Sequence, residues 1–166
     1  MVDHVLDTNV FLVASASHYE SPFDDSDLPV DLQERVLDWL KDFYEDNSRQ
    51  MVLDTCRKIF KEYGNKLTEQ DYGMLVIRNK MANARFVEID YDENGNGIVP
   101  EAFADFDPSD RKFLAALLTD VDNISLVNAC DTDWLEIEDQ LTQANACIIH
   151  LLEDWLRDKF NTKKGK

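Results

Sequence analysis

Short apolar segments alternate with longer segments of helical periodicity along most of this chain. In residues 31–47, for example, apolar side chains recur every three or four positions, which predicts an amphipathic helix. The apolar segments predict strands at residues 2–6, 50–53, 85–89 and 124–128, with a short edge strand near residues 147–149. This alternation favours an α/β fold, in which helices cover both faces of a mainly parallel sheet.

The length of 166 residues fits one domain spanning residues 1–166. Within it, residues 15–29 are polar and predict a loop, and Gly64 predicts the end of a helix that carries Ile59 and Tyr63. Residues 151–160 predict a last helix, followed by a frayed basic tail, so that residues 151–166 form a C-terminal helix and tail.

The formal net charge of −17 argues against a domain that binds nucleic acid through a broad basic face. It leaves open a metal-dependent nuclease, because bound cations reverse the local charge. It also leaves open a module that docks a basic protein partner. The three cysteines lack CxxC spacing, and neither a signal peptide nor a membrane-length apolar segment is present, so we expect a cytoplasmic protein without membrane contact.

Asp7 follows the first predicted strand and precedes a predicted helix. By itself an acid at this position is more often a helix cap than a ligand. Other acids lie at strand ends and helix starts, or, for Glu62, two turns into the helix after the second strand, and they can converge at one edge of a parallel sheet. The acids concerned are Asp7, Glu62, Asp110, Asp131 and Asp133. Carboxylates brought together there require a cation or raised pKa values, and Mg²⁺ or Mn²⁺ suits such oxygen ligands.

Four segments resemble the ordered motifs of PIN-domain nucleases. Residues 5–12 (VLDTNVFL) are similar to the opening motif, and residues 60–63 (FKEY) to the second. Residues 110–117 (DRKFLAAL) and 127–134 (VNACDTDW) resemble the third and fourth. Each match alone is weak, but the four occur in the family's order and cover residues 2 to about 135.

The resemblance implies a PIN-like three-layer α/β/α sandwich and a Mg²⁺- or Mn²⁺-dependent ribonuclease that hydrolyses phosphodiester bonds of single-stranded or structured RNA. It implies Asp7, Glu62, Asp110 and Asp131 as catalytic ligands, with Asp133 as a supplementary metal ligand. Asn9 would orient the first carboxylate or touch the substrate. Resemblance to toxins of type II toxin–antitoxin systems further implies an antitoxin partner and a homodimer.

Basic residues close to the acidic motifs in sequence are candidates for substrate binding. Arg111 adjoins Asp110, and Arg57 and Lys58 precede Glu62 by about one helical turn.

Two other interpretations compete with the nuclease. The first is a catalytically inactive PIN-like module that docks a basic protein partner through its acidic face. The second is a calcium site, because residues 90–101 (DYDENGNGIVPE) match the calcium-loop pattern with oxygen ligands at loop positions 1, 3, 5 and 12. The preceding residues 85–89 read as a strand instead of an entering helix, which argues against the calcium site.

Overall fold

The computed structural model describes residues 2–16 and 28–165. Five strands alternate with helices, as the sequence predicts. The strands are β1 (Asp3–Leu6), β2 (Val52–Asp54), β3 (Arg85–Val87), β4 (Ile124–Asn128) and β5 (Cys147–His150). The helices are α1 (Thr8–Ala14), α2 (Val30–Glu45), α3 (Lys58–Lys66), α4 (Tyr72–Met81), α5 (Arg111–Leu118), α6 (Asp133–Glu136), α7 (Glu138–Gln143) and α8 (Glu153–Lys164), with 3₁₀ turns η1 (Glu101–Phe103) and η2 (Pro108–Asp110).

All strand pairs are parallel, which confirms the predicted α/β class. One sheet has the order β1–β4–β5 and the other pairs β2 with β3. A parallel bridge between His4 and Met51 joins them, supported by a 3.0 Å hydrogen bond from His4 N to Gln50 O. The strands therefore follow each other in space as β3–β2–β1–β4–β5, with β1 at the centre between β2 and β4.

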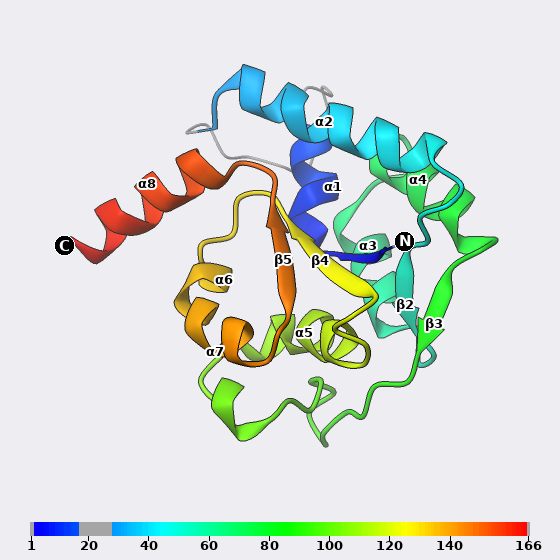
Figure 1. The fold of residues 1–166 in the computed structure, drawn as a ribbon. Coiled ribbons are helices and arrows are strands. Elements are labelled where there is room, and N and C mark those ends of the chain that lie inside the picture. The colour runs from blue at the N-terminus through cyan, green and yellow to red at the C-terminus, as the bar shows by residue number, and fades with distance from the viewer. Residues whose placement is uncertain (1, 17–27, 166) are drawn as a thin grey trace.

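Strands β1 and β4 run through the apolar centre of the molecule. Val5 and Leu6 of β1 are fully buried, and every residue of β4 is buried. Helix α1 packs with α2 and α4, whereas α5 packs against β1 and β4. In Figure 1, α2 and α4 lie above the strands and α5 lies below them, consistent with helices on both sides of a sheet. The predicted edge strand near residues 147–149 is confirmed as β5.

Two predicted helix ends are wrong. Helix α3 does not stop at Gly64 but continues to Lys66. Gly64 does not adopt the positive φ of a glycine that ends a helix, and it keeps helical geometry. Helix α8 runs to Lys164 and not to Phe160, so Lys163 and Lys164 of the tail predicted to be frayed are helical. Lys163 and Lys164 lie in its last turn, where positive charge stabilises the helix dipole.

Most of the predicted loop over residues 15–29 lies outside the described residues. None of the helices in residues 2–16 and 28–165 combines the length and the apolar character needed to cross a membrane.

Candidate metal centre

The carboxyl ends of β1 and β4 form the point where the strand order reverses. The chain proceeds from β1 to β2 on one side, and from β4 to β5 on the other. In open parallel sheets, the crevice outside such a reversal is where ligands bind. Asp7 follows β1 directly, and Asp131 lies three residues after β4, so both acids stand at this crevice.

The Asp7 carboxylate is held in a fixed position by two donors. Its Oδ1 accepts a 3.2 Å hydrogen bond from Asn9 N and caps α1, as the simplest interpretation of the sequence predicts. Its Oδ2 accepts a 2.7 Å hydrogen bond from the indole Nε1 of buried Trp134. Asp7 is therefore both a helix cap and part of the cluster at the crevice, with a side chain that is almost entirely buried.

An asparagine pair fixes the loop that carries Asp131. Asn9 Oδ1 accepts hydrogen bonds from Ala129 N (2.9 Å) and Cys130 N (3.2 Å), and Asn9 Nδ2 donates to Asn128 Oδ1 at 3.0 Å. Asn128 in turn binds the backbone N and O of Asp131. The side chain of Asn9 thus ties α1 to the end of β4, and it orients the Asp131 loop through hydrogen bonds.

Asp110 lies near the carboxylates of Asp7 and Asp131 and comes from the start of α5. It ends η2, immediately before α5, and one carboxylate oxygen from each of Asp7, Asp110 and Asp131 lies within 4.8 Å of the other two. The Asp110 carboxylate makes no capping hydrogen bond to its own helix. We call Asp7, Asp110 and Asp131 the aspartate triad.

The triad is electrostatically strained when it is fully ionised. Burial, followed by the negative charge of Asp131, raises the pKa of Asp7 to about 7. Burial, followed by the charges of Asp7 and Asp131, raises the pKa of Asp110 to about 8. Burial also raises the pKa of Asp131. Three clustered carboxylates that favour protonation are a donor set that a divalent cation fits, because its charge removes the same repulsion.

A second group of carboxylates shares Asp110 with the triad. Oxygens of Asp107, Asp110 and Asp133 also lie within 4.8 Å of one another. Asp133, predicted as a supplementary ligand, thus lies beside the triad through Asp110. Asp107, which is not among the predicted ligands, caps η2: its Oδ1 accepts hydrogen bonds from Ser109 N and Oγ. Its spacing of three residues from Asp110 is the sequence signal that could have identified it.

Glu62, the fourth predicted ligand, lies at the border of the triad. Its Oε1 forms a 2.7 Å ion pair with Lys112 Nζ, and its Oε2 accepts a hydrogen bond from Thr8 Oγ1. It does not belong to either group of acids within ligand reach. Its negative charge nevertheless contributes to the raised pKa values of Asp7 and Asp110.

The three predicted substrate-binding cations have different surroundings. The Arg111 guanidinium donates to the carbonyl oxygens of Phe106 (3.0 Å) and Ala104 (2.7 Å), so it fastens the loop before η2. Arg57 precedes α3 with a left-handed backbone and an exposed side chain. Lys58 places Nζ 5.1 Å from the centre of the Tyr91 ring.

The segment with the calcium-loop pattern folds as a tight turn. Tyr91 and Gly97 form an antiparallel bridge, and Asp92 Oδ1 accepts hydrogen bonds from Asn94 N and Asn96 N. The segment is flanked by β3 and by η1, in place of the two helices of a calcium-binding hand. Within the described residues, neither group of acids in ligand reach includes an acid of this segment.

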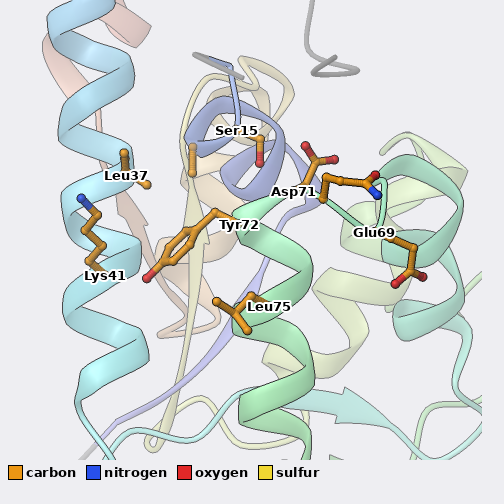
Figure 2. Close-up of a pocket in the computed structure, with 9 residues that line it drawn as sticks. Ser15, Leu37, Lys41, Glu69, Asp71, Tyr72 and Leu75 are labelled. Atoms are coloured by element: carbon orange, nitrogen blue, oxygen red, sulfur yellow. The ribbon is translucent and has the colours of Figure 1, made fainter. Parts of the chain in front are cut away.

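A separate cavity of about 590 Å³ lies between the end of α1 and helices α2 and α4. Figure 2 shows Tyr72 reaching from α4 toward Lys41 on α2, with Leu37 and Leu75 nearby. None of the acids predicted as metal ligands lines this cavity.

Comparisons with known proteins give no family for this chain. No family model matches it, and neither the curated proteins nor the solved structures contain a match.

Proposed function

We propose that this protein is a Mg²⁺- or Mn²⁺-dependent endoribonuclease with a PIN-like fold. The observation that supports the proposal is the convergence of Asp7, Asp110 and Asp131 within 4.8 Å at the reversal point of a parallel sheet. Hard oxygen ligands of this kind suit Mg²⁺ and Mn²⁺. The ordered resemblance of four sequence segments to PIN motifs is the basis for proposing phosphodiester hydrolysis as the reaction and RNA as the substrate.

Each residue of the triad has a separate task in this proposal. The Asp7 carboxylate accepts hydrogen bonds from Trp134 and Asn9, and the Asp131 carboxylate accepts one from Asp133 N, so both present oxygens in fixed positions. Asp110 makes no capping hydrogen bond and supplies the more adaptable ligand. When bound, one or two ions supply an activated water and stabilise the leaving oxygen of the phosphodiester.

Glu62 and Asp133 complete the surroundings of the triad. Glu62 is oriented by Thr8 and Lys112, so it would add a fixed negative charge at the border of the cluster when an ion is bound. Asp133 donates its backbone N to Asp131 Oδ1 at 2.9 Å and presents its own carboxylate toward Asp110.

Cleavage of single-stranded RNA in the presence of Mn²⁺ or Mg²⁺ tests this function. We expect Asp7→Asn, Asp110→Asn and Asp131→Asn to lower the rate by about two orders of magnitude. Asp122→Asn is the matched control, because Asp122 is exposed before the start of β4, at the opposite edge of the sheet. Full activity in all three triad variants would refute the site.

The alternative function is an inactive PIN-like module that docks a basic protein through its acidic face. The charge of −17 favours it. It predicts that wild-type protein cuts no RNA with either ion and that a basic partner binds in a salt-dependent way.

We further propose a cytoplasmic location for the protein. On the basis of the resemblance to PIN-domain toxins, we also propose an antitoxin partner and a homodimer.

A further inference from the structure

Four lysines line one cavity of about 340 Å³ beside the aspartate triad. The chain has 17 basic residues against 34 acidic ones, so this concentration of positive charge runs against the overall balance. We call the cavity the lysine pocket, and its lining residues are Lys58, Lys61, Glu62, Asn65, Lys66, Gly95 and Lys112. A pocket with this lining attracts an anion.

Three of the lysines form a row along α3. Lys58 and Lys66 are eight positions apart, which corresponds to about 12 Å along a helix axis, and Lys61 lies between them. In the described part of the chain, none of these three ammonium groups forms an ion pair with a carboxylate. Lys58 instead lies over the ring of Tyr91. The row therefore keeps its positive charge for a ligand.

The lysine pocket and the triad share a border. Glu62 lines the pocket and is paired with Lys112, which is two residues beyond Asp110. The other oxygen of Glu62 is bound by Thr8, the residue after Asp7. A ligand that occupies the pocket therefore lies next to the place where the triad would act.

We propose that the lysine pocket binds backbone phosphates of a nucleic-acid strand whose neighbouring phosphodiester lies at the triad. The inference rests on the proposed function and deepens it. A row about 12 Å long offers more cations than one phosphate requires, so it selects an extended strand over a mononucleotide. It also explains how so acidic a protein holds a polyanion: the attraction is confined to one pocket.

Binding of a fluorescein-labelled oligouridylate tests the inference. We would measure anisotropy in EDTA, in an Asp110→Asn background that keeps this position of the triad uncharged at every pH. The triple change Lys58→Gln, Lys61→Gln and Lys66→Gln is compared with Lys41→Gln, Lys159→Gln and Lys164→Gln. The control removes the same charge from exposed lysines on α2 and α8.

We expect the pocket variant to bind the strand roughly tenfold more weakly, and the slope of log K against log salt to fall by about 2. The control variant should bind within about twofold of its parent. Equal losses in both triple variants, or an unchanged salt slope, would overturn the inference, because net charge alone would then account for binding. Competition by polyglutamate as strong as that by unlabelled oligouridylate would also overturn it.

A calorimetric titration of wild-type protein with Mn²⁺ tests the proposed function separately. Absence of Mn²⁺ binding refutes the metal centre and with it the position of a phosphodiester at the triad. A normal Mn²⁺ titration combined with equal oligouridylate losses in both triple variants refutes only the lysine pocket.

Discussion

The indole of Trp134 donates a 2.7 Å hydrogen bond to Oδ2 of Asp7, a residue 127 positions away in the chain. The bond is buried and its acceptor is a carboxylate, which makes it stronger than a bond between neutral groups. It lowers the pKa of Asp7, against the larger effects of burial and of the charge on Asp131. Trp134 therefore favours the ionised form of Asp7 and holds its carboxylate in a fixed position.

Replacing Trp134 by phenylalanine should weaken Mn²⁺ binding by about tenfold at neutral pH, because Asp7 loses a donor that stabilises its charged form. Isothermal titration calorimetry of folded protein measures the effect. Trp155→Phe serves as the control, since Trp155 lies on α8 and its ring faces Lys159 instead. Equal Mn²⁺ affinity in both variants would contradict the role of the indole.

The stability of the ion-free protein should depend on the protonation of the triad. The pKa values of Asp7 and Asp110 are raised from the ordinary 3.8 to about 7 and about 8, so the folded state binds protons more tightly than the unfolded chain. These groups therefore lower the free energy of unfolding as pH rises from about 4 to about 8, and their cost stays constant above that. Urea denaturation in EDTA at several pH values measures this loss.

Comparison with Asp110→Asn isolates the contribution of the triad to this pH dependence. We expect the variant to lose less stability than wild type between about pH 4 and pH 8, with a difference on the order of 3 kcal/mol at the upper end. Saturating Mn²⁺ should restore much of the lost stability in the wild type only. Parallel pH profiles for the two proteins would show that the triad carries no strain.

Asn9 should be more important for stability than an ordinary surface asparagine. Its side chain makes three hydrogen bonds, to Ala129 N, Cys130 N and Asn128 Oδ1. Asn9→Ala leaves these groups without their partner, so we expect a loss of about 2–3 kcal/mol in urea denaturation and weaker Mn²⁺ binding. Asn161→Ala, at an exposed position of α8, should change stability by less than about 0.5 kcal/mol.

Two glycines should respond in opposite directions to alanine. A Cβ at Gly97 would stand 2.8 Å from Lys112 Cα, so Gly97→Ala pushes the turn off α5 and should cost about 1–3 kcal/mol. A Cβ at Gly64 meets nothing within 4 Å and lies inside α3, so Gly64→Ala should stabilise by about 0.5–1 kcal/mol. Thermal denaturation measures both, and destabilisation by Gly64→Ala would show that the helix needs a glycine there.

The strand and helix pattern could be predicted from the sequence because it depends on local periodicity. β4 is a run of buried residues between turns, and α2 has a clear apolar stripe, so both could be identified from neighbouring residues alone. Gly64 misled the prediction of a helix end because glycine is tolerated inside a helix when its neighbours propagate the hydrogen bonds.

The meeting of Asp7, Asp110 and Asp131 could be anticipated because the carboxyl ends of parallel strands and the start of a helix that packs on them can meet at one edge of the sheet. The hydrogen bond from Trp134 to Asp7 and the ion pair of Glu62 with Lys112 could not, since both depend on how distant elements pack. Arg111 shows the same limit: its position beside Asp110 suggested a substrate contact, but two nearby carbonyl groups accept its hydrogen bonds.

The separation of Asp7 and Trp134 in the chain has a consequence during synthesis. A ribosome adding about 5–20 residues per second needs roughly 6–25 seconds to add the 127 residues from Thr8 to Trp134. Throughout that interval, the nascent chain already carries Asp7 but lacks the indole and, until shortly before its end, Asp131. Fragments released early by a stalled ribosome would therefore lack a complete aspartate triad. The triad and the Trp134 hydrogen bond can form only after the residues that follow β4 have been made.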